Sequence, residues 1–166
     1  MPRHLLCYDF TGDGYLHDVD INGVKYTLDI LDVGGGEEEG IEPAEVSKYI
    51  REYDGFIIVC AVNNRDGWDR VEAEFVHPIR AKDPTKPPAL VVVANKSDLA
   101  AHLPGRMSTA ELRAVAERLC RVDVPFFEVS AKMNSGVDQI FAEAAEQALK
   151  QHRTSPPLPL RTLGQL

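Results

Sequence analysis

Three short, largely apolar runs alternate with helical patterns along this chain, and this alternation constrains the fold more than any other feature. The runs are Phe56–Val62, Ala89–Ala94 and Pro125–Val129. Such runs are typical of strands buried on both faces of a parallel sheet. A helical pattern follows each of them, over residues 66–80, residues 108–122 and the segment after Ser135. The order predicts an α/β fold in three layers, with a mostly parallel sheet and helices on both faces.

An antiparallel hairpin is predicted ahead of these units. Residues Leu16–Ile21 alternate apolar and polar side chains, as a half-exposed strand does. Asn22-Gly23 is a strong turn signal, and Lys25–Val33 is the expected partner strand. A short helix is expected over Pro43–Tyr53.

The length of 166 residues suits one compact domain. We expect this domain over residues 1–152, followed by a proline-containing, disordered tail over residues 153–166. Within the domain, Ser108 and Glu111 have the spacing of a capping box and should start the helix over residues 108–122.

Composition and charge exclude several classes of protein. The net charge of −8 argues against binding to nucleic acid or anionic lipid, which needs clustered Lys and Arg. Cys7, Cys60 and Cys120 have no CxxC spacing and indicate free thiols in a reducing compartment. No signal-peptide pattern is present, and no apolar stretch approaches the ~18 residues of a membrane span. We therefore expect a cytoplasmic protein, and one without a C-terminal lipid anchor, because "RTLGQL" contains no cysteine.

Polar clusters follow three of the predicted strands. They are Asp32–Gly36, Asn95–Asp98 and Ser130–Lys132. In open α/β sheets, ligands bind outside the carboxyl ends of the strands, so these clusters predict a shared ligand site.

The three clusters resemble motifs of the Ras-type small GTPases, in the same order and at similar separations. "LDILDVGGGEEE" resembles the D-x-x-G segment, with Asp32 and Gly35 in its two fixed places. "NKSD" resembles the guanine motif N-K-x-D, and "VSAKMNSGV" resembles the S-A-K motif. The resemblance extends from about Tyr8 to His152, and it implies GTP or GDP with Mg²⁺ as cofactors and protein effectors or regulators at switch-like loops.

The resemblance implies a guanine site formed by Asn95, Lys96, Asp98, Ser130, Ala131 and Lys132. The Asp98 carboxylate would accept hydrogen bonds from N1 and the exocyclic amino group of guanine. Adenine has no donors there and would leave the carboxylate unpaired, which can discriminate by ~10⁴-fold or more. The backbone N–H of Ala131 would donate to O6. The alternative is that Lys96 and Lys132 are solvated surface lysines and that Asp98 caps a turn.

On the phosphate side, the resemblance implies that Asp32 holds a Mg²⁺-bound water and that the N–H of Gly35 contacts a γ-phosphate. "YDFTGDGY" is similar to the first switch region, with Thr11 as the candidate Mg²⁺ ligand. The alternative is that the glycine- and glutamate-rich run is a flexible acidic loop.

The sequence departs from the family pattern in two places. It contains no G-x-x-x-x-G-K-[ST] phosphate-binding loop, so we expect the fold to lack its first strand, that loop and the first helix. Residues 4–10 are a candidate for the missing central strand, but their link to Leu16 is too short for a parallel crossover. Gly36 stands where the family usually has the glutamine that positions the attacking water.

The sequence is consistent with two functions. One is a guanine-nucleotide-binding signalling protein, a GTPase by descent whose hydrolysis of GTP is weak or absent. The other is a pseudo-GTPase, an interaction module that retains the scaffold without binding nucleotide.

Overall fold

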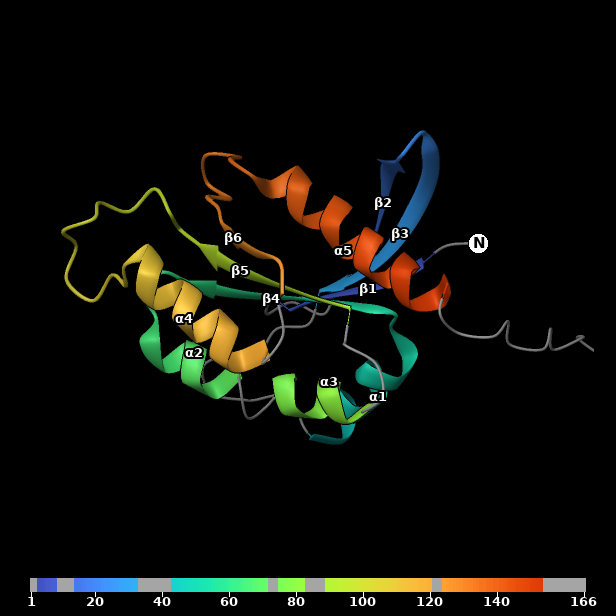
Figure 1. Ribbon diagram of the computed structural model, residues 1–166, viewed down its shortest axis with the longest axis horizontal. Helices are drawn as coiled ribbons and strands as arrows, with labels where there is room; N and C mark the ends of the chain where they lie inside the picture. Colours follow the sequence, from blue (N-terminus) through green and yellow to red (C-terminus); the bar gives the residue numbers. More distant parts are fainter. Residues whose placement is uncertain are drawn as a thin grey trace, which may run out of the picture.

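One mixed sheet forms the centre of the molecule. The computed structural model describes residues 3–8, 14–32, 43–71, 75–82, 89–120 and 124–153. Within these residues, six strands have the order β2-β3-β1-β4-β5-β6 (Figure 1). They are β1 Arg3–Tyr8, β2 Gly14–Ile21, β3 Val24–Asp32, β4 Gly55–Ala61, β5 Leu90–Asn95 and β6 Phe126–Glu128. The edge strand β2 is antiparallel to β3, and the other neighbouring pairs are parallel.

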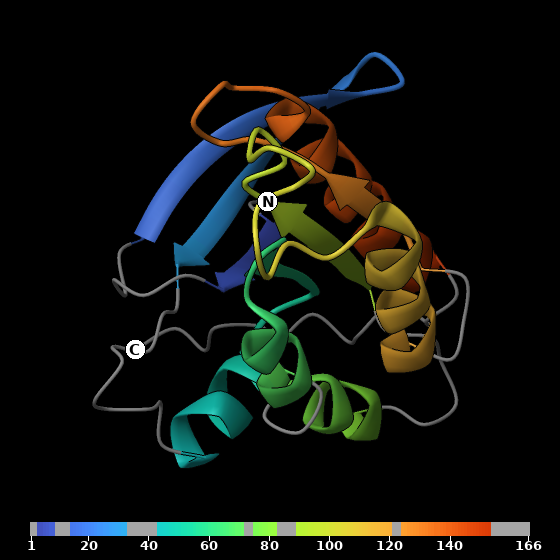
Figure 2. The same ribbon diagram turned by 90° about the vertical axis from the view of Figure 1, so that its left-hand side faces the viewer.

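Helices cover both faces of this sheet. They are α1 Pro43–Glu52, α2 Arg65–Val71, α3 His77–Lys82, α4 Thr109–Cys120 and α5 Val137–Arg153. Figures 1 and 2 show α5 on one face and the other four helices on the opposite face. Successive β4 residues face the two sides, since Phe56 packs in a core cluster with Trp68 and Ile57 packs in a second cluster with Ile140. The predicted three-layer α/β fold is confirmed.

The predicted hairpin is present and closes through a two-residue turn. Asn22 and Gly23 have φ angles of 54° and 79°, and both lie in the left-handed region that a type I′ turn requires. The Asp20 carboxylate accepts a hydrogen bond from the Gly23 N–H at 2.8 Å. Ile21 is paired with Val24, which fixes the register of the whole hairpin.

The central position of the sheet is occupied, and here the structure differs from the prediction. Strand β1 lies between β3 and β4, with Cys7 paired with Asp32 and Leu5 paired with Gly55. Residues 4–10 were doubted as the central strand because a parallel crossover to the hairpin was assumed. However, β2 runs antiparallel to β3 and therefore opposite to β1. Gly14 is paired with Leu31, so the end of β1 and the start of β2 lie at the same edge of the sheet. Residues 9–13 therefore need to span only two strand spacings, roughly 10 Å.

The helices confirm the local signals with one modification. Ser108 and Glu111 form the predicted capping box: the Ser108 N–H donates to the Glu111 carboxylate at 2.9 Å, and the Glu111 N–H donates to Ser108 Oγ at 3.3 Å. The pattern read as one helix over residues 66–80 corresponds to α2 and α3, and residues 72–74 lie outside the described part. No helix in the described ranges is both long and apolar enough to cross a bilayer.

Candidate functional site

The loops after β5 and β6 lie side by side because their strands are in register. Ala94 is paired with Glu128 at the end of the shared ladder. Beyond the ladder, the Ser97 N–H donates to the Val129 carbonyl and the Val129 N–H donates to the Ala94 carbonyl, both at 2.9 Å. The structure therefore brings together the two predicted guanine motifs, which are more than thirty positions apart in the sequence.

The Asn95 side chain connects the two loops. Its Oδ1 accepts hydrogen bonds from the backbone N–H of Lys96 at 2.7 Å and of Ala131 at 3.0 Å. The second bond crosses from one motif to the other. The Ala131 N–H, predicted to donate to a guanine, is thus engaged by the carboxamide of Asn95.

Asp98 and Ser130 form the shortest side-chain contact between the motifs. Ser130 Oγ donates to Asp98 Oδ1 at 2.6 Å and accepts a hydrogen bond from the Met133 N–H at 3.1 Å. Ser130 is only 2% exposed, whereas Asp98 lies at the surface. The buried hydroxyl of Ser130 therefore fixes the orientation of the exposed carboxylate of Asp98.

The environment of Asp98 favours its charged form. The hydrogen bond from Ser130 is the main cause that lowers the pKa of the Asp98 carboxyl, and the charges of Lys132 and Lys96 act in the same direction. At neutral pH the group is therefore an ionised acceptor without a proton of its own. Both lysines are exposed. The backbone of Lys96 has a φ of 66°, a left-handed conformation that residues other than glycine rarely adopt outside constrained loops.

The chemical groups at this site are a surface carboxylate and two lysines. An ionised carboxylate offers two oxygens to two neighbouring N–H donors, and the positive lysines beside it suit an anionic ligand. The loop of residues 130–135 is closed by backbone hydrogen bonds between Ser130 and Ser135 in both directions, which limits its freedom. Gly136 continues it at a φ of 78°, where an added Cβ would lie 3.1 Å from the side chain of Val129.

The predicted phosphate and metal residues are only partly described. Asp32 ends β3 and is half-buried beside the end of β1. Thr11 and Gly35 lie outside the described residues. In the described ranges, no three His, Cys, Asp or Glu side chains form a group that could hold a metal ion. The Mg²⁺ site at Asp32 and Thr11 therefore stays a prediction.

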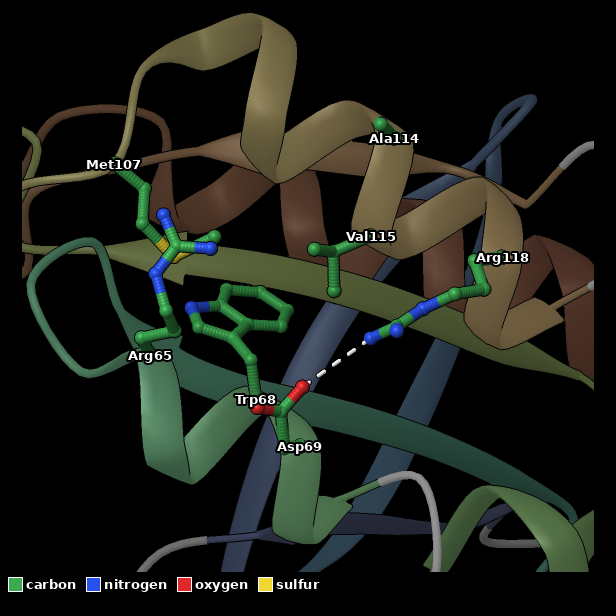
Figure 3. A pocket seen from close by; sticks show the side chains of 7 residues that line it. All are labelled: Arg65, Trp68, Asp69, Met107, Ala114, Val115 and Arg118. Atoms are coloured by element: carbon green, nitrogen blue, oxygen red, sulfur yellow. Dashed lines mark hydrogen bonds and ion pairs between the residues drawn. The ribbon is translucent and has the colours of Figure 1, made fainter.

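A separate cavity of about 440 Å³ lies between α2 and α4 (Figure 3). Trp68 and Met107 are buried residues of its lining, and Val115 adds a half-buried side chain. Arg118 of α4 forms an ion pair with Asp69 of α2 at 3.3 Å at one end, as the dashed line in Figure 3 marks. None of the predicted guanine-site residues contributes to its lining, so this cavity is distinct from the motif loops.

Arg106 is a residue near the motif loops that the sequence did not suggest. Its guanidinium donates to the carbonyl of Leu99, next to Asp98, at 3.1 Å. In the sequence it follows Gly105, and no residue pattern around it distinguishes it from an ordinary solvated arginine. Only the turn signal of Pro104-Gly105 hinted that the chain folds back there.

Comparisons with known proteins agree on one family. A model described as the Ras family matches residues 7–150. The chain is similar to Ras-related protein R-Ras of Homo sapiens, with 33% identity over 148 residues, which are 89% of this chain and 64% of the relative. The R-Ras proteins of Rattus norvegicus and Mus musculus are each 32% identical over the same length. The chain thus spans less than two thirds of the length of these relatives.

Proposed function

Since this chain belongs to the Ras family, we propose that it is a guanine-nucleotide-binding signalling protein whose hydrolysis of GTP is weak or absent. The observation that carries the proposal is the Asp98 carboxylate, which is exposed, ionised and oriented by Ser130 at the ends of two adjacent parallel strands. GTP or GDP with Mg²⁺ are the cofactors, and protein effectors or regulators are the partners. We place the protein in the cytoplasm, where a free buried thiol such as that of Cys60 stays reduced.

Recognition of the base depends on both motif loops. Asp98 accepts hydrogen bonds from the N1 and amino groups of guanine, and Lys96 and Lys132 flank it with positive charge. A bond from the Ala131 N–H to O6 requires Asn95 to share or release that donor, which it holds at 3.0 Å. The Asn95 carboxamide then becomes available to the other edge of the purine.

The phosphate-binding half of the proposed site has fewer binding groups than the guanine-binding half. Asp32 and Thr11 are proposed for Mg²⁺ and the Gly35 N–H for the γ-phosphate. The 166 residues contain no G-x-x-x-x-G-K-[ST] loop, so the backbone cradle and lysine of that motif are not among the groups that can hold the phosphates. Gly36 has no side chain with which to position a water molecule. These two features support slow or absent hydrolysis.

Base selectivity is the direct test of the proposal. We expect GDP to raise the unfolding temperature and ADP at the same concentration to leave it unchanged, because adenine would leave the Asp98 carboxylate unpaired. At 100 times the dissociation constant, a ligand adds about 2.7 kcal/mol to the free energy of unfolding. Thermal unfolding with each nucleotide, with and without Mg²⁺, gives the answer. Equal shifts with GDP and ADP would refute guanine recognition.

Hydrolysis can be measured separately from binding. Intrinsic hydrolysis by Ras-type proteins is already slow, at about 10⁻⁴ s⁻¹. We expect a lower rate here, because Gly36 offers no group to orient the attacking water. Single-turnover hydrolysis of labelled GTP by excess protein measures this rate. A value at or above that figure contradicts this part of the proposal.

One observation favours the alternative of an interaction module that binds no nucleotide. Strand β1 is separated from β2 only by residues 9–13, so the central strand is followed by a short link and not by a phosphate-binding loop and helix. Under this alternative, neither GDP nor ADP changes the unfolding temperature at millimolar concentration. The same melting experiment therefore separates the two functions.

A further inference from the structure

The side chain of Arg106 lies between the loop that follows β5 and the Glu128 side chain of β6. Its Nε donates to the Leu99 carbonyl at 3.1 Å, and one terminal nitrogen donates to the Met107 carbonyl at 3.0 Å. The other terminal nitrogen lies 4.0 Å from a carboxylate oxygen of Glu128 in β6. The Arg106 side chain is 12% exposed and that of Glu128 is 20% exposed, so water screens this contact less than it screens a surface ion pair.

The positions of these contacts are informative. Leu99 directly follows Asp98, and Glu128 lies two residues before Ser130. One planar guanidinium therefore bonds the residue after Asp98 and lies 4.0 Å from a side chain two residues before Ser130. Asp98 and Ser130 themselves form the 2.6 Å pair. Its fork of fixed donors bonds two carbonyls of one loop while it lies beside the Glu128 carboxylate, which the single ammonium of a lysine does poorly.

We infer that Arg106 is a positioning residue for guanine recognition, which it serves by holding Asp98 and Ser130 in the geometry that the base requires. This inference rests on the proposed function. Arg106 acts through these neighbours and needs no contact with the nucleotide. Its bond to the Leu99 carbonyl also closes the loop of residues 99–106. The Met107 N–H donates to the Val62 carbonyl at 2.8 Å and anchors the end of that loop beside β4.

The test compares Arg106→Gln with Arg118→Gln in the full chain. Arg118 is a matched control, because it is an arginine paired with the carboxylate of Asp69 but is 55% exposed and remote from the motif loops. The first measurement is hydrogen exchange at the amides of Ser97 and Ala131, without nucleotide. The second is calorimetry with GDP and with ADP. The third is the unfolding midpoint in urea.

We expect Arg106→Gln to speed exchange at both amides and to weaken GDP binding roughly tenfold, as the loss of an orienting partner does in metal sites. Binding of ADP should not change, so the ratio between the two nucleotides falls. A residue that only stabilises the fold would lower the midpoint and weaken both nucleotides together. Arg118→Gln should leave amide exchange and the nucleotide ratio unchanged.

The inference is overturned if exchange at Ser97 and Ala131 stays at the wild-type rate, or if Arg118→Gln accelerates it equally. Exchange needs no nucleotide, so a wild-type protein that fails to prefer GDP refutes the proposed function while the exchange result still decides the role of Arg106. Should Arg106→Gln fail to fold, Glu128→Gln replaces it, because it keeps the arginine and removes only the carboxylate. It should speed exchange to a smaller degree, and wild-type exchange in that variant overturns the inference.

Discussion

Replacing Asp98 with alanine is expected to weaken GDP binding by about 10²–10⁴-fold, because guanine loses two hydrogen bonds to a charged acceptor. Binding of ADP should change by less than about threefold, since adenine has no donors to offer that carboxylate. Selectivity for guanine would then disappear together with affinity. Calorimetric titration of the wild type and the variant with both nucleotides measures the effect.

The control is Glu117→Ala, which removes an exposed carboxylate of α4 without touching the motif loops. Glu117→Ala and Asp98→Ala each remove one negative charge, so a general electrostatic effect on nucleotide binding would appear in both variants. We expect wild-type affinity for GDP in this control. A parallel loss of GDP and ADP binding in Asp98→Ala would contradict base recognition and indicate a damaged fold.

The pH dependence of binding reports on the same group. The Ser130 hydroxyl holds the pKa of the Asp98 carboxyl below its usual range. The carboxylate therefore stays ionised as the pH falls, and the ratio of GDP to ADP affinity, in which the shared diphosphate cancels, should be constant from roughly pH 7 to pH 5, above the ordinary pKa of an aspartate. Ser130→Ala removes the bond to the charged form, so the fall of this ratio on acidification should begin at a higher pH than in the wild type.

Much of this site followed from the sequence because its determinants are local. The sheet register that brings Asp98 to Ser130 depends on two apolar runs, and the strand ends are marked by the change from apolar to polar residues. The run in β6 was expected to be buried on both faces, but β6 is an edge strand and its residues are half-buried. The hairpin was evident because Asn22-Gly23 adopts the positive φ angles that few other pairs tolerate. The start of α4 was evident because Ser108 and Glu111 satisfy each other's backbone donors.

The remaining features depend on tertiary structure that no local pattern encodes. The link between residue 10 and Leu16 seemed too short for a crossover between parallel strands. No such crossover is needed, because β2 runs opposite to β1. Its place between two parallel neighbours could not be derived from Arg3–Tyr8 alone. Arg106 acts through carbonyls of Leu99 and Met107, and a carbonyl acceptor leaves no trace in the choice of residue.

The stability of the fold should depend most on Trp68. Its side chain is fully buried in the cluster that packs α1 to α4 against the sheet, and its indole N–H donates to the Ala61 carbonyl at 3.1 Å. Trp68→Ala removes this packing and one of the two hydrogen bonds that the Ala61 carbonyl accepts, since the Asn64 N–H still donates to it at 3.1 Å, so we expect a loss of about 3–5 kcal/mol in the free energy of unfolding. For a chain of this size that corresponds to a fall of roughly 6–20 °C in Tm.

Two further variants separate packing from hydrogen bonding. Trp68→Phe keeps an aromatic ring but loses the donor to Ala61, and it should lie between the wild type and the alanine variant. Met133→Ala removes a side chain that is 65% exposed and should stay within about 0.5 kcal/mol of the wild type. Trp68 is the only tryptophan, so unfolding in urea must be followed by circular dichroism, since the variants lose the fluorescent probe.

The cavity between α2 and α4 narrows the stability loss expected for Trp68→Ala. Trp68 forms part of its lining together with the exposed side chains of Arg65 and Arg118 (Figure 3), so truncation enlarges an opening that already reaches the surface and does not create a sealed void. Water can then enter and relieve part of the penalty, which places the expected loss toward the lower end of the range. A loss below about 1 kcal/mol would contradict the buried position of the indole, because even complete hydration of the cavity cannot replace its contacts with the core.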